Sequence, residues 1–278
     1  MSLIRLAHAG RPKTFMFTSS VSTCMGIGHP SPTVPETPIG DDPSVSLCTG
    51  YALSKYIGKP FPSQAMVQSN TNLVERITQE ANKILGLDIK LLRVGQICGS
   101  TLTGNWNTSE MWPIMFATSA HPKINAIPLF PGKMVDWIPV DVAAATITDI
   151  LLCQENGYSV HNIVNSHLIE WKELVEMLQS SALKTEEAKM EEVDMKEWVH
   201  RLKILASDAG VSPTTIPGLK LLHFFENMCN ELEGHVVSKV FETEKTRGVS
   251  SALRDCVAMR REWIEMNVKK WRERCFVV

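Results

Sequence analysis

The sequence lacks several features that would assign a protein to a class at once. None of its seven cysteines forms a Cys-x-x-Cys pair, so no zinc site or disulfide framework is indicated and no metal is expected. No run approaches the ~20 apolar residues that span a bilayer, and residues 1–15 lack the apolar core of a signal peptide. These absences predict free thiols in a reducing compartment, which we take to be the cytoplasm.

The chain also lacks a strong net charge, internal repeats and low-complexity tracts. Its formal net charge is −2 over 278 residues, of which 44% are hydrophobic and 21% charged. Surfaces that bind nucleic acid or anionic membranes usually carry an excess of basic residues, so neither partner is expected. The length suits one large globular domain or two small ones.

A glycine-rich phosphate loop is missing as well. No Gly-x-Gly-x-x-Gly lies between a predicted strand and a predicted helix, the arrangement that holds the pyrophosphate of a dinucleotide. The nearest match, Gly26-Ile27-Gly28, runs into the turn-rich stretch His29-Pro30-Ser31-Pro32. We therefore give it little weight as a phosphate loop.

The chain does contain a Tyr-x-x-x-Lys pair, Tyr51 and Lys55, on a predicted helix. At this spacing two side chains lie on one helix face, one turn apart. A free phenol titrates near ~10, and an ammonium group one turn away lowers that pKa by favouring the phenolate. Taken alone the pair is weak, because a surface helix with a solvated lysine gives the same spacing by chance.

Two predicted strands flank this helix. Thr14–Phe17 is apolar and is followed by Ser19 and Ser20, and Leu91–Val94 runs into the loop Gly95–Gly99. Open α/β sheets bind ligands at the carboxyl ends of parallel strands, where these segments would meet. The alternative for Ser20 is a strand-end serine that only satisfies backbone groups.

Taken in order, these motifs resemble the thioester-reductase family, also described as male-sterility-type NAD-binding proteins, an extended branch of the short-chain dehydrogenases/reductases. The family supplies terminal reductases of fungal nonribosomal-peptide-synthetase-like enzymes and of carboxylic acid reductases. The resemblance runs from about Leu3 to Trp271. The motifs that carry it are Gly50-Tyr51-x-x-Ser54-Lys55, Arg93-Val94-Gly95-Gln96-Ile97-x-Gly99, Gly104-Asn105-Trp106-Asn107 and Val135-Asp136-Trp137-Ile138-Pro139-Val140-Asp141.

The resemblance implies a catalytic set of Ser20, Tyr51 and Lys55. Tyr51 would donate a proton to the developing oxyanion, Ser20 would hold that oxygen, and Lys55 would bind the ribose and tune Tyr51. The implied cofactor contacts are Tyr51, Lys55, Val94, Gly95 and Gln96.

The implied reaction is hydride transfer from NADPH, the family's usual donor, to an acyl thioester on a phosphopantetheine arm. The product is an aldehyde, or an alcohol after a second round, in fungal-type secondary metabolism. Because the chain has no carrier-domain serine motif, the substrate would arrive on an acyl carrier protein, on coenzyme A, or free. The sequence does not distinguish NADPH from NADH, name the acyl group, or indicate an oligomeric state.

The expected fold is α/β, a partial doubly wound, Rossmann-like parallel sheet that lacks its N-terminal phosphate-binding half. Residues 1–160 would form this reductase portion, with strands near Thr14, Leu91 and Ile163, and residues 161–278 a mostly helical substrate-binding part. Asp141 is expected to cap a helix over Val142–Leu152. Further helices are predicted from Ser166, from Asp194 with a capping box to Glu197, over Leu219–Leu232 and over Leu253–Trp271.

Gly58–Leu73 interrupts the predicted helix that carries Tyr51. Pro60 and Pro62 cannot continue a helix, whereas the flanking sequences join into one helical pattern when the segment is removed. The segment is either a tolerated loop-out or, as we hypothesise, a translated intervening sequence.

Two functions therefore stay open from the sequence. Intact Ser20, Tyr51 and Lys55 favour an active reductase. The missing phosphate loop and the interruption after Ile57 favour a truncated, inactive relic or fragment without a competent cofactor site.

The missing phosphate loop generates a first prediction. A doubly wound site needs a βαβ unit of about 30 residues, and only 14 residues precede Phe15. We expect this polypeptide alone to bind NADPH with a millimolar Kd, about −4 kcal/mol, and to show no reductase activity. Calorimetric titration with NADPH measures the affinity; saturable micromolar binding would reveal a phosphate site that sequence reasoning missed or that a partner supplies.

Overall fold

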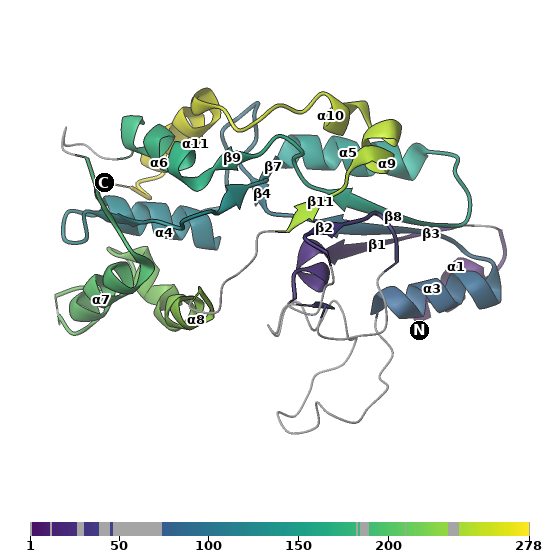
Figure 1. Ribbon diagram of the computed structural model, residues 1–278, viewed down its shortest axis with the longest axis horizontal. Helices are drawn as coiled ribbons and strands as arrows, with labels where there is room; N and C mark the ends of the chain where they lie inside the picture. Colours follow the sequence, from purple (N-terminus) through teal and green to yellow (C-terminus); the bar gives the residue numbers. More distant parts are fainter. Residues whose placement is uncertain are drawn as a thin grey trace, which may run out of the picture.

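The computed structural model of the chain shows a half built on a sheet and a half built of helices (Figure 1). In Figure 1 the sheet half lies on the right with the N-terminus, and the helical half lies on the left with the C-terminus. Tyr51, Lys55 and the Gly58–Leu73 segment lie outside the residues that the structure describes. Those residues are 2–11, 13–26, 31–38, 45–46, 74–181, 183, 189–208, 210–232 and 239–277.

The central sheet has three described strands in the order β1-β3-β8, all parallel. The register pairs Ser20 with Val94 and Val94 with Ile163, so the three strands end at the same edge of the sheet. The predicted strands are therefore confirmed, and they share one sheet. Their bounds are Thr14–Ser20 for β1, Asp88–Val94 for β3 and Tyr158–Ile163 for β8.

The middle strand, β3, is buried on both faces, as a parallel strand covered by helices should be. Ile89, Leu91 and Leu92 are fully buried in it. It also carries two buried cations, Lys90 and Arg93, which need partners at this depth. Lys90 donates to the carbonyl oxygen of Glu155 and lies 3.4 Å from a carboxylate oxygen of Asp88; the partner of Arg93 belongs to the site.

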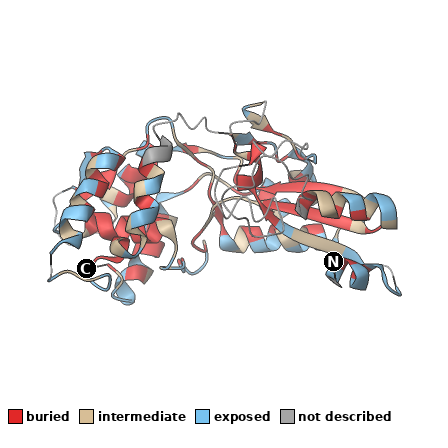
Figure 2. Ribbon diagram, turned by 90° about the horizontal axis from the view of Figure 1, so that it is seen from below, coloured by how far each residue is buried: buried red, intermediate tan, exposed pale blue. Residues whose placement is uncertain are grey.

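Helices cover both faces of this sheet. On one face α1 and α3 pack on Ile89, and on the other α5 and α10 pack on Leu92 and Ile163. Figure 2 shows the buried residues concentrated in the strands and on the inner sides of the helices. The bounds are Ser2–His8 for α1, Val74–Leu85 for α3, Val140–Leu152 for α5, Glu244–Val249 for α9 and Ser251–Arg254 for α10.

The helical half is organised around a cluster of aromatic rings. Trp112 lies 5.0 Å from Trp137 and 5.1 Å from Trp171 between ring centroids, and Trp106 lies 5.7 Å from Trp271. The chain enters this half after β3, returns to the sheet for α5 and β8, and returns to it once more for α9 and α10, so the two halves interleave. Its helices are α4 Met111–Ala120, α6 Trp171–Ser180, α7 Met195–Ala206, η3 Pro217–Leu221, α8 Leu222–Leu232 and α11 Arg261–Glu273.

Short two-stranded ladders tie distant segments together. β6 pairs antiparallel with β9, and the other three ladders, β2 with β11, β4 with β7 and β5 with β10, are parallel. Their bounds are β2 Thr33–Val34, β4 Ile97–Cys98, β5 Ala126–Pro128, β6 Met134–Val135, β7 Ile138–Pro139, β9 Ile169–Glu170, β10 Glu191–Val193 and β11 Val240–Phe241.

The expected cap at Asp141 is wrong. Helix α5 begins two residues earlier than expected, at Val140, with Pro139 in the capping position. This places Asp141 in the first turn, where its carboxylate accepts from the backbone N–H and the hydroxyl of Thr101 at 2.8 and 2.5 Å. The side chain thus anchors a neighbouring loop.

Tertiary contacts also moved two helix boundaries and left one cap as predicted. The helix expected from Ser166 begins at Trp171, because Ile169–Glu170 pairs with β6. The helix expected over Leu253–Trp271 is two helices, α10 and α11, and the segment between them is held where Asn165 donates to the carbonyl oxygen of Val257 at 2.9 Å. The cap at Asp194 is confirmed, with its carboxylate accepting from the N–H of Glu197 at 2.8 Å.

A bilayer-spanning helix was not expected. Across the described ranges, no helix is both long enough and apolar enough to cross a membrane.

His161 lies in the buried part of β8 and is 1% exposed. Its two ring nitrogens lie 3.1 Å from the hydroxyl oxygens of Thr246 and Ser159. Burial, reinforced by the nearby ammonium groups of Lys245 and Lys90, lowers the pKa of His161 to about 4. The folded protein therefore holds this imidazole neutral at pH values where an unfolded chain protonates it.

This neutral histidine predicts that acid destabilises the fold. Because the folded pKa lies below the ordinary value of ~6.5, the unfolded chain binds a proton that the folded chain does not, and stability falls as the pH drops from about 6.5 towards 4. We expect His161→Gln to remove up to about 3 kcal/mol of that loss, measured by urea unfolding at pH 7 and pH 4.5. The exposed His167 supplies the control His167→Gln; equal pH dependence in all three proteins would contradict the prediction.

Candidate functional site

Ser20 stands at the carboxyl end of β1, at the edge of the sheet where ligands bind in open α/β folds. It caps the short 3₁₀ helix η1, Val21–Cys24. Its hydroxyl oxygen accepts from the N–H of Ser22 at 3.3 Å and from the hydroxyl of Ser22 at 3.0 Å, and its carbonyl oxygen accepts from Thr23 at 2.7 Å. The serine is thus held in place by the turn that follows it.

The loop after β3 lies beside Ser20, because Ser20 and Val94 are register partners. The N–H of Gly95 donates to the carbonyl oxygen of Ile163 at 3.0 Å, and the carbonyl oxygen of Gln96 accepts from the N–H of Ile138 at 2.9 Å. A β-carbon at Gly95 would lie 2.6 Å from a side-chain carbon of Val164. Glycine is therefore required here by close packing on the chain after β8.

The side-chain amide of Gln96 is engaged by the protein itself. Its nitrogen donates to the carbonyl oxygen of Ile97 at 2.7 Å, and its oxygen accepts from the indole N–H of Trp112 at 3.1 Å. Gln96 thus links the loop at the sheet edge to the aromatic cluster of the helical half. Trp112 and Trp106 are 6% and 3% exposed, so both are core residues.

A buried ion pair supports the whole edge. Glu75 on α3 accepts from two nitrogens of Arg93 on β3, at 3.0 and 3.3 Å. The two residues are 3% and 0% exposed. The other carboxylate oxygen of Glu75 accepts from the hydroxyls of Ser19 at 2.6 Å and Thr23 at 3.1 Å. Arg93 also donates to the carbonyl oxygen of Pro35 at 3.3 Å.

This network holds the chain on both sides of Ser20, since Ser19 precedes it and Thr23 lies in the following turn. Burial opposes the charge on Arg93, but the Glu75 carboxylate outweighs that effect and the pKa of Arg93 is raised. Sequence reasoning treated Val74-Glu75-Arg76-Ile77 only as the continuation of a helix. A signal was present, because an arginine inside an otherwise apolar strand requires an anionic partner.

A cysteine also lies at this edge without being a nucleophile. Cys24 is fully buried in η1. Burial raises the pKa of Cys24 to about 11, although the Arg93 guanidinium acts in the opposite direction. The thiol is therefore protonated at neutral pH, and a protonated thiol is unreactive.

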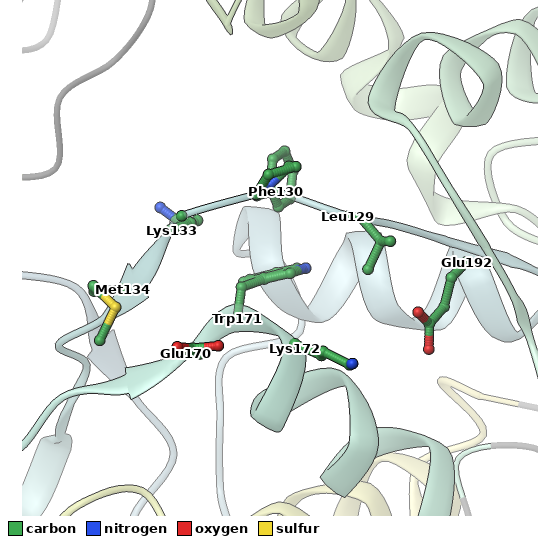
Figure 3. A pocket seen from close by; sticks show the side chains of 10 residues that line it. Leu129, Phe130, Lys133, Met134, Glu170, Trp171, Lys172 and Glu192 are labelled. Carbon is green, nitrogen blue, oxygen red and sulfur yellow. The ribbon is translucent and has the colours of Figure 1, made fainter.

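A pocket of about 400 Å³ lies in the helical half, and Lys133 in its lining lies over the ring of Trp112, 5.4 Å from the centroid. Figure 3 shows Trp171 in the middle of its lining, with Lys133 and Met134 to one side and Lys172 and Glu192 to the other. The lining residues are Leu129, Phe130, Pro131, Gly132, Lys133, Met134, Glu170, Trp171, Lys172 and Glu192.

Comparison with known proteins identifies the family. The family model described as male sterility protein, an NAD-binding family, matches residues 1–147 of the 278. The chain belongs to this family. The resemblance read from the motifs is therefore confirmed, as is the Rossmann-like α/β fold of an extended reductase.

Curated relatives are much longer than this chain. It is 32% identical over 221 residues to the adenylate-forming reductase Nps10 of Heterobasidion annosum, covering 78% of this chain and 17% of that protein. It is 28% identical over 265 residues to the non-reducing polyketide synthase dbaI of Emericella nidulans, covering 93% of this chain and 9% of that protein. The chain thus spans between about a tenth and a fifth of these relatives.

Solved structures show the same fold. The terminal R domain of the myxalamid PKS-NRPS pathway superposes with a TM-score of 0.75 at 21% identity, covering 99% of this chain and 62% of that one. The reductase domain of a Mycobacterium tuberculosis nonribosomal peptide synthetase gives a TM-score of 0.65 at 19% identity, covering 99% and 64%. The two solved structures are thus reductase domains of secondary-metabolite synthases, and the two curated relatives are named for reductase or synthase activity.

The described edge fits the nicotinamide end of a cofactor. The hydroxyl of Ser20 lies there, and the Gly95–Gln96 backbone lies next to it at the strand ends. These are the positions at which the family resemblance places catalytic and cofactor contacts. Tyr51 and Lys55, the other members of that set, lie outside the described residues and stay predictions.

The Glu75–Arg93 pair generates a stability prediction. Removing one member of a buried ion pair leaves the other charge without compensation and costs about 3–5 kcal/mol. We expect that loss for Glu75→Gln in chemical unfolding, and partial recovery when Arg93→Leu is combined with Glu75→Leu. The control is Glu80→Gln on the same helix, where Glu80 pairs with Lys83 at the surface, and a change below about 1 kcal/mol is expected. Equal effects of the Glu75 and Glu80 variants would show that the buried network is not stabilising.

Proposed function

We propose that this chain is the catalytic part of an NADPH-dependent reductase that converts a carrier-bound acyl thioester to an aldehyde or alcohol. The observation that carries the proposal is the adjacency of Ser20 and the Gly95–Gln96 loop at the carboxyl edge of the sheet. Family membership supports a nicotinamide cofactor at that edge. The choice of NADPH over NADH rests on the family resemblance alone.

The hydrogen bonds of Ser20 suit an oxyanion donor. A serine hydroxyl has one hydrogen to donate and two lone pairs that accept. In both of its side-chain contacts with Ser22 the oxygen of Ser20 is the acceptor, from the N–H and from the hydroxyl. The hydroxyl hydrogen is then available for a substrate oxygen, and a donor fixed in advance stabilises charge that develops in the transition state.

The remaining roles in the proposal are those that the family resemblance implies. A nicotinamide held at this edge would supply the hydride, and the residues of the chain would orient it. Tyr51 would protonate the substrate oxygen that Ser20 holds, and Lys55 would bind the ribose and favour the phenolate of Tyr51. Val94, Gly95 and Gln96 would contact the nicotinamide end, mainly through the backbone, because the Gln96 amide is already engaged.

A carrier-bound substrate is supported by the kind of proteins that share this fold. One neighbour is a thiolation-reductase di-domain of an archaeal nonribosomal peptide synthetase, with a TM-score of 0.65 at 17% identity. We propose that an acyl carrier protein delivers the phosphopantetheine thioester to this chain as well, in secondary metabolism of the cytoplasm. Residues 161–278 would provide most of the substrate-binding surface.

The test is thioester reduction by a fusion that places the preceding dinucleotide-binding segment of a relative before this chain. Tyr51→Phe should lower turnover by about 10²–10⁴-fold and Ser20→Ala by about 10²–10³-fold, with cofactor affinity largely kept. Turnover is followed by NADPH absorbance with acyl N-acetylcysteamine thioesters. Ser19→Ala is the matched control, because that hydroxyl donates to Glu75 and a loss below about tenfold is expected. A wild-type fusion that binds NADPH but reduces no thioester would refute the proposed function.

A further inference from the structure

The peptide group that joins Gly95 to Gln96 is a free donor and acceptor at the sheet edge. Both residues are half-buried. The loop is fixed on either side of this group, since the N–H of Gly95 donates to Ile163 and the carbonyl oxygen of Gln96 accepts from Ile138. Within the part of the chain that the structure describes, the carbonyl oxygen of Gly95 and the N–H of Gln96 have no hydrogen-bond partner. Peptide groups withdrawn from bulk water are seldom left unpaired, so this one is suited to polar atoms of a bound molecule.

The orientation of this peptide group is not fixed by the backbone alone. Its plane turns with the backbone dihedrals of Gly95 and Gln96, and glycine, which lacks a β-carbon, allows a wider range of them than any other residue. A restraint on the Gln96 side is therefore needed if the free N–H and carbonyl are to point in one direction.

The side chain of Gln96 supplies such a restraint. Its amide nitrogen donates to the carbonyl oxygen of the next residue, Ile97, at 2.7 Å. Its amide oxygen accepts from the indole N–H of Trp112 at 3.1 Å. The first bond stays within the loop, so the bond to Trp112 is the one that ties this side chain to another element, the first turn of α4.

Trp112 is a rigid anchor for this tether. It is 6% exposed, and its ring packs against those of Trp137, Trp171 and Phe116, with 5.0, 5.1 and 6.3 Å between centroids. A close-packed indole cannot turn without displacing its neighbours, so the direction of its N–H is fixed by the aromatic core.

We propose that Trp112 is a positioning residue for the cofactor. Through its hydrogen bond to the Gln96 amide it fixes the orientation of the Gly95–Gln96 peptide group, and it acts without touching the cofactor itself. The inference rests on the proposed function, which places the nicotinamide end at this edge, and it extends that site to a residue buried in the helical half.

Binding of a cofactor fragment tests the inference without turnover. The probe is reduced nicotinamide mononucleotide, which carries the nicotinamide end but no pyrophosphate, titrated into the full chain at pH 7 by ligand-observed NMR. We expect a millimolar Kd for the wild-type chain. Trp112→Phe and Gln96→Met should each raise that Kd about three- to tenfold, the range for one neutral hydrogen bond. The double variant should raise it no further, because both substitutions remove the same bond.

The matched control is Trp106→Phe. Trp106 belongs to the same aromatic cluster, is 3% exposed and also donates its indole N–H at 3.1 Å, but to the carboxylate of Glu110. This variant should lower stability in urea about as much as Trp112→Phe and change the Kd less than twofold. An unchanged Kd in Trp112→Phe, an equal rise in Trp106→Phe, additive losses in the double variant, or no binding by the wild-type chain would each overturn the inference.

Gln96→Glu keeps the test decisive if Trp112→Phe does not fold, as judged by circular dichroism. A glutamate retains an oxygen that accepts from the indole N–H, so this variant should bind the probe at least threefold more tightly than Gln96→Met, and equal binding would contradict the inference. A chain that shows the expected pattern but whose fusion reduces no thioester refutes the proposed function alone. A reducing fusion built on a chain whose Kd does not respond to Trp112→Phe refutes this inference alone.

Discussion

The buried ion pair between Glu75 and Arg93 is the interaction on which the rest of the sheet edge depends. Two charges removed from water lose several kcal/mol of hydration each, and their attraction compensates only when the remaining donors and acceptors are also bonded. This condition is met by both residues. Glu75 also accepts from Ser19 and Thr23, and Arg93 also donates to the carbonyl oxygen of Pro35. One pair therefore joins α3, β3, the end of β1, η1 and the segment before Glu36, which are the segments that surround Ser20.

A second buried carboxylate, Glu36, fixes the C-terminal segment against the sheet in a similar way. It accepts from the backbone N–H groups of Asn162 at 3.0 Å and Lys245 at 2.7 Å. It also accepts from the N–H and the hydroxyl of Thr246. Burial raises the pKa of Glu36, and these donors act in the opposite direction. The group thus holds α9 on β8, and Thr246 in turn lies beside the neutral His161.

The two halves of the molecule contribute different kinds of groups. The sheet edge supplies fixed polar groups, Ser20 and the Gly95–Gln96 backbone, at the place where charge would develop. The helical half contributes a buried aromatic core and one half-buried cation, Lys133. Trp112 connects them, since it bonds Gln96 through its N–H and meets Lys133 with its ring face.

The sequence by itself determined the three parallel strands, the position of Ser20 at a strand end, the cap at Asp194 and the family. These features depend on local periodicity and on motifs whose residues lie close together in the chain, and such patterns can be read without knowing the fold. Only the tertiary structure decided that Arg93 pairs with Glu75 and that Gln96 is hydrogen-bonded to Trp112. It also decided that the Asp141 carboxylate accepts hydrogen bonds from Thr101 and that the helix expected over Leu253–Trp271 is interrupted. Each of these depends on which segments meet in space, as with Glu36 and Thr246, which are 210 residues apart. A charged residue in a buried strand indicates from the sequence that it needs a partner of opposite charge. Which residue is that partner follows only from the packing.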